Sequence, residues 1–245
     1  MAGLLRGRRL LVTGASAGIG AAVARAAVAA GARVALLARN GARLADLATE
    51  LGPDAVPVTC DITDDAAIVG ALDDAVARLG GGLDGLVNAA GVFTAGPLSD
   101  TDPAAWRAMF EVNVLGLLAV TKAAVPHLRA GNAPSVVNVS SMSGRRVARF
   151  ESGVYAATKF AVHALGESLR GELVPQGIRV STVAPGLVDT GIADSWPAGE
   201  FADAFRERLH GDGLPAAAVA DAVVHVLSTP AGVNVVEYAV LSVRQ

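Results

Sequence analysis

The chain is poor in residues that bind metals or form cross-links. Its 245 residues include a single cysteine, Cys60, which excludes an internal disulfide and any metal site built from cysteines. The four histidines share no spacing that is typical of metal ligands: His127, His163, His210 and His225. We therefore expect no metal ion in the functional site.

Charge is also scarce. Charged residues make up 18% of the chain and the net charge is −3, so no basic face is available for nucleic acids or anionic membranes. Polar residues, Gly or Pro interrupt each long apolar run, which argues against a membrane-spanning helix. The N-terminus leads directly into a strand pattern without the core of a signal peptide. These features predict a cytoplasmic protein.

Short runs rich in Val, Leu and Ile alternate with longer Ala-rich segments of helical periodicity. The expected strands cover 9–13, 33–38, 55–60, 85–89, 135–140, 178–183 and 235–241. The expected helices cover 19–30, 42–51, 64–79, 103–129, 153–174 and 216–228. Runs that are apolar throughout indicate strands buried on both faces, so the alternation predicts a parallel sheet with helices on both sides. No linker or repeat divides the chain, and we expect one α/β, doubly wound domain over 1–245.

A glycine-rich turn follows the first expected strand. The stretch from Thr13 to Gly20 reads T-G-A-S-A-G-I-G, and Gly14, Gly18 and Gly20 stand between a strand and a helix. Glycines there let the backbone turn tightly and approach a pyrophosphate, whose charge is favoured by the N-terminus of the helix. This setting predicts a dinucleotide site, with a turn that serves packing alone as the alternative.

The end of the second strand indicates which dinucleotide binds. Arg39 lies nineteen residues after Gly20, about where this type of fold contacts the adenosine ribose. An acidic residue there would bind the 2′-hydroxyl of NAD, whereas arginine suits a 2′-phosphate, so NADP(H) is the expected cofactor. A solvated arginine is the alternative. Asp61, after the third strand, is placed either to accept a hydrogen bond from adenine or to cap a helix.

Tyr155 and Lys159 form a pair of rare residues. The chain has two tyrosines, and only two of its 20 basic Lys and Arg residues are lysines. Positions four apart share one face of a helix, so the two side chains project together. An ammonium group nearby stabilises a phenolate, and we expect Lys159 to lower the pKa of Tyr155 toward neutrality. Tyr155 would then act as a general acid or base, unless the pair is only a surface lysine beside a packed tyrosine.

Six motifs occur in order along the chain. They are T-G-x-x-x-G-I-G at 13–20, D-x-L-V-N at 84–88 followed by A-A-G, Asn113 in F-E-V-N-V-L-G, V-N-V-S-S at 137–141, Y-x-x-x-K at 155–159 and P-G at 185–186. Together they resemble the short-chain dehydrogenases/reductases of the compact, single-domain kind, over almost the whole chain. The resemblance implies a seven-stranded sheet of order 3-2-1-4-5-6-7 and a nicotinamide cofactor.

The resemblance also implies roles for individual residues. Tyr155 would transfer a proton, Ser141 would hydrogen-bond the substrate oxygen, Lys159 would hold the nicotinamide ribose, and Asn113 would position a water beside Lys159. Val188 and Thr190 would lie near the carboxamide end of the cofactor. The full expected cofactor-binding set is Gly14, Ser16, Gly18, Ile19, Gly20, Arg39, Asp61, Asn88, Gly91, Tyr155, Lys159, Pro185, Gly186, Val188 and Thr190.

The chain departs from the family pattern at three places. The usual Asn-Asn-Ala-Gly reads N-A-A-G at 88–91. Ser141 precedes Tyr155 by fourteen positions, about one more than usual, so we expect a bulge between them and keep Ser140 and Ser143 as alternatives to Ser141. The glycine loop has Ala17 where many NADP-dependent members have a basic residue, which leaves the preference for NADP to the region of Arg39.

Segments around the expected site suggest how a substrate is held. Arg145, Arg146 and Arg149 lie near its mouth and either recognise a carboxylate or phosphate or remain solvated. The Gly- and Pro-rich stretch at about 186–213 is expected to cover the substrate as a mobile loop. Apolar candidates for contacts in the pocket are Phe93, Met142, Phe150, Trp196 and Phe201.

The favoured function is NADPH-dependent reduction of a ketone or aldehyde to an alcohol. Abundant alanine and arginine suggest a GC-rich bacterium, where such reductases serve biosynthetic pathways. The alternative is NADP-dependent oxidation of a 3-hydroxy acid, since the ending N-V-V-E-Y-A-V-L-S-V-R-Q is similar to that subgroup; a catalytically silent cofactor sensor is a distant third. The family commonly associates through the helices at 103–129 and 153–174, which predicts a homodimer or homotetramer.

Overall fold

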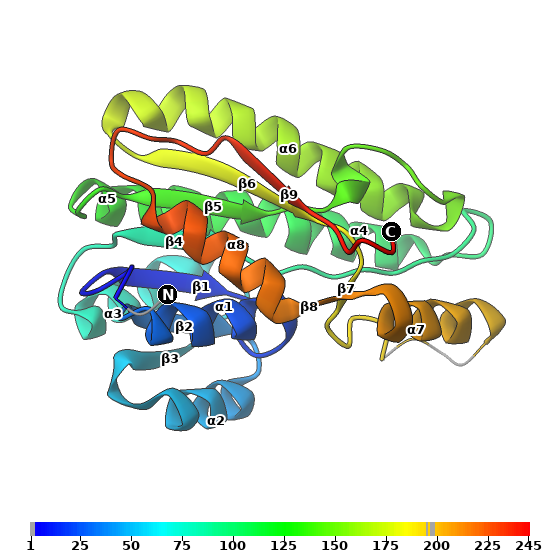
Figure 1. The fold of residues 1–245 in the computed structure, drawn as a ribbon, viewed down its shortest axis with the longest axis horizontal. Helices are drawn as coiled ribbons and strands as arrows, with labels where there is room; N and C mark the ends of the chain where they lie inside the picture. Colours follow the sequence, from blue (N-terminus) through cyan, green and yellow to red (C-terminus); the bar gives the residue numbers. More distant parts are fainter. Residues whose placement is uncertain (1–2, 195, 197–198) are drawn as a thin grey trace.

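The computed structural model describes residues 3–194, 196 and 199–245, and its main feature is a seven-stranded parallel sheet (Figure 1). The strand order is β3-β2-β1-β4-β5-β6-β9. The strands are β1 (Arg9–Thr13), β2 (Arg33–Ala38), β3 (Ala55–Thr59), β4 (Gly85–Asn88), β5 (Ser135–Val139), β6 (Arg179–Pro185) and β9 (Glu237–Val240). The predicted fold class and strand order are confirmed, and each strand agrees with its predicted range to within two residues at either end.

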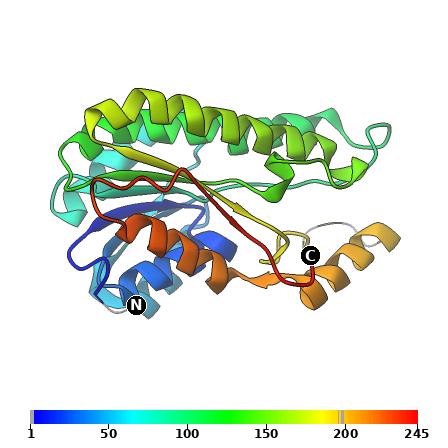
Figure 2. The ribbon, with the colours of Figure 1, turned by 45° about the horizontal axis from the view of Figure 1, so that its top comes forward.

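Helices cover both faces of the sheet (Figure 2). One face is packed against α1 (Gly18–Ala29), α2 (Gly41–Leu51) and α8 (Ala216–Ser228). The other face is packed against α3 (Asp65–Leu79), α5 (Leu117–Arg129) and α6 (Gly153–Leu173). The helix α4 (Pro103–Phe110) continues through a π-helical turn at Glu111–Gly116 into α5. All six helical segments expected from the sequence are therefore present.

The order of the strands places a crevice between β1 and β4. From β1 the chain proceeds to β2 and β3 on one side, and from β3 it crosses to β4 on the other side. Connections that leave two neighbouring strands in opposite directions open a crevice at the carboxyl ends of those strands. Proline has no N–H to donate to a neighbouring strand. Pro57 is tolerated in β3 because β3 is an edge strand with a partner on one side only.

Asp84 ties the opposite, amino end of the sheet together. Its buried carboxylate accepts hydrogen bonds from the Arg9 amide (2.8 Å), from Nε and Nη2 of Arg9 (3.1 and 3.0 Å) and from the Asn132 amide (2.6 Å). Burial alone would raise the pKa of Asp84, but these hydrogen bonds outweigh it and the pKa is lowered. The carboxylate thus joins β1 to the loop before β5.

The segment at 186–213 differs from its prediction as a loop. It contains the helix α7 (Glu200–Asp212) and the strand β7 (Val188–Asp189), which pairs with β8 (Leu214–Pro215). Figure 1 shows α7 beyond the carboxyl ends of the main strands. The helix is missing from the prediction because its sequence is mostly polar and follows several Gly and Pro residues. The side chain of Phe201, an expected pocket contact, lies outside the described part.

One helical segment, 103–129, is long and apolar enough to cross a membrane by length and composition. Glu111, Asn113 and Lys122 interrupt this segment, as expected from the sequence, but its mean hydropathy still reaches 1.6. Core helices of water-soluble proteins meet the same criteria. In this chain 44% of the apolar window is buried, and Val120, Ala124 and Leu128 of α5 pack into the core beneath the sheet.

We predict that Asp84→Asn lowers the free energy of unfolding at neutral pH by about 3 kcal/mol, because the Arg9 guanidinium and two amides lose a charged acceptor. The contribution of a carboxylate with a lowered pKa is present above its unfolded-state pKa and is lost as pH falls through the folded-state value. Denaturant unfolding should therefore show a difference that shrinks below about pH 4. The exposed Asp46→Asn is the matched control, and an equal effect in both variants would contradict the assignment.

Candidate active site

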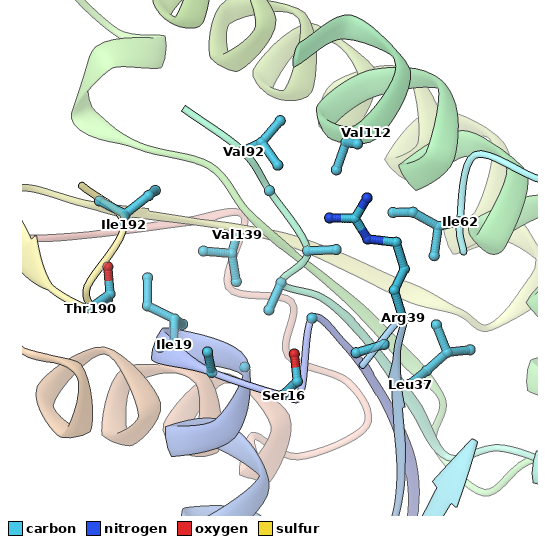
Figure 3. Close-up of a pocket in the computed structure, with 18 of the residues that line it drawn as sticks. Ser16, Ile19, Leu37, Arg39, Ile62, Val92, Val112, Val139, Thr190 and Ile192 are labelled. Carbon is cyan, nitrogen blue, oxygen red and sulfur yellow. The ribbon is translucent and has the colours of Figure 1, made fainter. Parts of the chain in front are cut away.

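A cleft of about 760 Å³ opens at the carboxyl ends of the strands, at the crevice between β1 and β4 (Figure 3). Most of the residues predicted to bind the cofactor line it: Gly14, Ser16, Gly18, Ile19, Gly20, Arg39, Asp61, Gly91, Tyr155, Lys159 and Thr190. Figure 3 shows Arg39 at one end of the cleft and Thr190 and Ile192 at the other. The cleft is therefore elongated in the direction that a dinucleotide would need.

The glycine loop from Thr13 to Gly20 approaches neighbouring backbone too closely for side chains. Gly14 has φ of +67°, and a Cβ there would lie 2.7 Å from Cα of Ala90. A Cβ on Gly20 would collide with the carbonyl oxygen of Gly14. The Thr13 hydroxyl fixes this contact, because it accepts hydrogen bonds from the amides of Ala89 and Ala90, both at 3.1 Å.

The start of α1 suits an anionic group. Its N-cap residue, Ala17, provides no side-chain hydrogen bond, and the first turn has no acidic residue. The N–H groups of that turn are then left to a ligand, and the helix dipole favours a negative charge there. Together with the space that the glycines leave, the residues present fit the pyrophosphate of a dinucleotide.

Arg39 and Asp61 lie together at the adenosine end. Arg39 is exposed over 68% of its side chain, and its Nη1 is 3.9 Å from Oδ2 of Asp61. Figure 3 shows the guanidinium reaching over the cleft toward Ile62 and Val112. Asp61 accepts hydrogen bonds from the amide (3.0 Å) and hydroxyl (2.8 Å) of Thr63, and the amide bond is the main cause of its lowered pKa. The N-cap of α3 is Asp64, so Asp61 does not cap that helix.

Tyr155 and Lys159 share one face of α6, but their electrostatics differ from the prediction. The Lys159 ammonium is buried and donates to the Val139 carbonyl at 3.0 Å, and burial lowers its pKa to about 8. Desolvation raises the pKa of Tyr155 to about 12, against a smaller lowering by a hydrogen bond with Ser141. The expectation of a lowered Tyr155 pKa is wrong for this structure, because Lys159 faces Val139 and desolvation dominates.

The structure separates the three candidate serines. Ser141 lies beside Tyr155, and its Oγ accepts a hydrogen bond from the Ser143 amide at 3.0 Å. Ser140 points elsewhere: its hydroxyl donates to the Lys159 carbonyl at 3.2 Å and lies 2.9 Å from Nδ1 of His163. Two 3₁₀ turns, at 142–144 and 150–152, lie between Ser141 and Tyr155. Ser141 is thus the hydroxyl available to a substrate oxygen.

Asn113 lies in the π-helical turn and positions backbone around the site. Its side chain accepts a hydrogen bond from the Val92 amide at 2.8 Å and donates to the Val92 carbonyl at 2.9 Å. It also donates to the Thr158 hydroxyl at 3.1 Å, which in turn donates to the Tyr155 carbonyl at 2.7 Å. Neither Val92 nor Thr158 was predicted as part of the site, since their types carry no chemical signal.

Four other predicted cofactor residues lie outside the first cleft. Asn88 is buried, and its amide donates to the Thr121 hydroxyl and to the Asn138 side chain, both at 2.9 Å. Its side chain lines neither cleft and joins β4 to its neighbours instead. The remaining three, Pro185, Gly186 and Val188, line a second and smaller cleft.

This second cleft, of about 240 Å³, meets the first at Tyr155. Ser141 and Met142 line it as well, and so does Phe93, whose ring centroid is 4.4 Å from that of Tyr155. Phe205 of α7, which the sequence did not indicate, lies 5.8 Å from Phe93. Phe150 is 75% exposed and lines neither cleft. The second cleft therefore has the position of a substrate site.

Trp196 connects Phe93 in the loop after β4 with α7. Its indole N–H donates to the Phe93 carbonyl at 3.1 Å, and its ring stacks on that of Phe205 with centroids 5.0 Å apart. The Arg206 guanidinium donates to the carbonyls of Trp196 (2.6 Å) and Ala193 (3.1 Å). The rings of Trp196 and Phe205 thus pack against Phe93, which lies against Tyr155.

Comparisons with known proteins identify the family of the chain. The model of the short chain dehydrogenase family matches residues 8–200. An uncharacterized oxidoreductase of Staphylococcus epidermidis is 35% identical over 227 residues, which are 93% of this chain and 94% of that protein. The chain therefore belongs to the short-chain dehydrogenase family and is an oxidoreductase.

Two solved structures show how closely the fold is shared. The closed form of a serine dehydrogenase complexed with NADP⁺ is 30% identical, with a TM-score of 0.86 over 97% of this chain and 96% of that one. A 3-ketoacyl-(acyl-carrier-protein) reductase from Brucella melitensis complexed with NADH is 28% identical, with a TM-score of 0.85 over 98% and 99%. The two structures differ in cofactor and in reaction. The cofactor and the reaction of this chain must therefore be inferred from its own residues.

We predict that the pH dependence of stability reveals the buried Lys159. Between the folded-state pKa of about 8 and the ordinary lysine pKa of 10.5, the unfolded chain holds a proton that the folded chain has released, so stability rises with pH. Relative to Lys159→Met, the wild type should gain about 3 kcal/mol across this range in denaturant unfolding. A constant difference would show that Lys159 stays protonated. Lys122→Met, on an exposed position of α5, is the matched control.

Proposed function

We propose that the protein reduces a ketone or aldehyde to an alcohol with NADPH. The observation that carries this proposal is the position of Tyr155, which lines both the cofactor cleft and the second cleft. If the carbonyl carbon of a substrate faced the nicotinamide, its oxygen would lie beside the Tyr155 hydroxyl, which can donate a proton to it. The cofactor, when bound, supplies the hydride; the chain supplies the proton and the positioning.

Each residue of the site would have a separate task. Tyr155 donates its phenolic proton to the carbonyl oxygen, and Ser141 donates a hydrogen bond to the same oxygen and orients it. Lys159, protonated below about pH 8, stabilises negative charge that develops on Tyr155 during the transfer. Asn113 holds the loop at Val92 against α6 through its hydrogen bonds to the Val92 backbone and to Thr158. A Tyr155 pKa of about 12 keeps the phenol protonated at neutral pH, which suits a proton donor.

The alternative direction, oxidation of a 3-hydroxy acid, requires Tyr155 to accept a proton. The serine dehydrogenase neighbour supports this reading, and the ketoacyl reductase neighbour supports reduction. The raised Tyr155 pKa favours reduction, because a phenolate base is scarce at neutral pH. A silent cofactor sensor is disfavoured, since Ser141, Tyr155 and Lys159 lie together around the clefts.

NADP(H) is proposed as the cofactor because of Arg39. Its guanidinium is exposed at the adenosine end of the cleft and is only loosely paired with Asp61, at 3.9 Å. A 2′-phosphate would offer it a closer and stronger acceptor. Arg43 lies outside the cleft lining, while Asn40 lines the cleft and accepts a hydrogen bond from the Arg43 amide.

We also propose a cytoplasmic homodimer or homotetramer. Phe110, Leu115 and Phe160 are exposed on the helices around α4, α5 and α6. Large exposed apolar side chains that gather on one group of helices favour association with another protein surface.

Replacing Tyr155 by Phe should lower kcat for a reducible ketone by at least about a hundredfold, since the proton donor is removed. The affinity for NADPH should change little, because the ring and its packing remain. Oxidation of NADPH followed by absorbance measures the first quantity, and quenching of Trp fluorescence by NADPH measures the second. Turnover at the wild-type rate in this variant would refute the role of Tyr155.

Arg39→Gln should lower kcat/KM for NADPH about tenfold or more, because a charge-assisted hydrogen bond to the phosphate is lost. NADH has no 2′-phosphate and serves as the internal control, with little change expected. The ratio of kcat/KM values for the two cofactors reports the effect directly. A wild type that prefers NADH, or an equal loss with both cofactors, would show that Arg39 does not select NADP.

A further inference from the structure

The second cleft combines an apolar wall with charged side chains on its open side. The wall begins at Tyr155 and includes Phe93, Phe205 and Ile192. The charged side chains that line the cleft are Arg146, Arg149, Glu151 and Arg208, and the three arginines are exposed to solvent. The lining thus carries three positive groups and one negative group, an excess that the sequence as a whole, with its net charge of −3, does not share.

Two of these arginines already have acidic partners. Nε of Arg149 is 3.6 Å from Oε2 of Glu151, and Nε of Arg208 is 4.0 Å from Oδ2 of Asp212. Within the part of the chain that the structure describes, Arg146 has no acidic group at ion-pair distance. It is the one cation of the lining without such a partner.

The arginine next in sequence provides a contrast. Nε of Arg145 is 3.3 Å from Oε1 of Glu237 on β9, and Arg145 lines neither cleft. Two adjacent arginines therefore point to different surroundings, one toward a carboxylate of the protein and the other into the lining of the second cleft. The sequence motif R-R alone does not distinguish them.

The cofactor does not account for Arg146. Arg146 is absent from the lining of the first cleft, whose own cationic groups are Arg39 and Lys159. Arg146 lines the second cleft together with Tyr155 and Ser141, so an anionic group of a molecule bound in that cleft can reach it.

We propose that the substrate is an oxo acid whose carboxylate binds Arg146 while its carbonyl oxygen faces Tyr155 and Ser141. A guanidinium offers a planar pair of donors that matches a carboxylate. One unpaired arginine balances the single charge of a carboxylate, whereas a phosphate dianion would call for two. This inference rests on the proposed reductase function. The carbonyl carbon receives a hydride from NADPH and the carbonyl oxygen receives a proton from Tyr155. The oxo acid thereby becomes a hydroxy acid, and its carboxylate is unchanged.

The test compares acids with their esters. Acetoacetate and levulinate differ in the distance between carbonyl and carboxylate, and each is assayed beside its methyl ester with NADPH. For at least one pair, the wild type should favour the acid over the ester about tenfold or more in kcat/KM. Arg146→Gln should abolish that preference by raising KM for the acid, with kcat and the ester reaction nearly unchanged. Arg146→Lys should restore part of the preference.

Arg6→Gln is the matched control. Arg6 is exposed and precedes β1, so the same charge is removed at the amino edge of the sheet, opposite the clefts. It should leave the ratio of acid to ester unchanged. A wild type that reduces esters as well as acids, or an Arg146→Gln variant that keeps the preference, would overturn the proposal.

A separate outcome concerns the reductase function itself. If the wild type oxidises NADPH with none of the four compounds, calorimetric titration of levulinate into the protein with NADP⁺ decides the anion site independently of turnover. Binding in the wild type that is lost in Arg146→Gln would uphold the site while the reductase proposal fails for these ketones. Equal binding in both proteins, or no binding in either, would overturn the site as well.

Discussion

The hydroxyl of Thr13 makes the contact on which the cofactor cleft depends. It accepts hydrogen bonds from the amides of Ala89 and Ala90 and so joins the end of β1 to the end of β4. The direction of the chain connections reverses between these two strands. The two backbones approach so closely that only glycine is accommodated at position 14. This contact fixes the distance between the glycine loop and the loop after β4. Both loops line the first cleft, so its width at this point depends on that distance.

The face of α6 that carries Tyr155 and Lys159 depends on a second set of backbone contacts. The carbonyl of Tyr155 is held by Thr158 and, through it, by Asn113, while the carbonyl of Lys159 is approached by Ser140 and His163. Gly144 permits this arrangement, because a Cβ there would collide with His163. The helix is thus fixed at the two residues to which the proposed function assigns catalytic roles. The same enclosure that gives this precision removes water from both side chains, which is why their pKa values move in opposite directions.

The sequence predicts the regular part of this structure well. The seven main strands and the helices up to α6, together with α8, follow from apolar runs, helical periodicity and the glycine turn, because local propensity and burial agree there. The helix α7 escapes prediction, since its polar sequence has no periodicity that decides between helix and loop. The contacts that Asn88, Ser140 and Arg145 make could not be predicted from the sequence either. Each depends on a partner that the fold brings from a distant segment: Thr121 for Asn88, His163 for Ser140 and Glu237 for Arg145.

These differences follow a physical division between the two clefts. The cofactor cleft is built largely from backbone and from glycines at which a Cβ would meet another chain segment, so its chemistry can be read from a short motif. The second cleft is built from side chains that follow β4, β5 and β6 and from α7, where a larger or smaller ring at Phe93 or Phe205 leaves the glycine loop untouched. Phe93 and Phe205 line the second cleft alone, so substitutions there leave the lining of the first cleft unchanged. For the same reason, the part of the sequence that determines the substrate is the part in which local patterns say least, and the unpaired Arg146 becomes informative only once its surroundings are known.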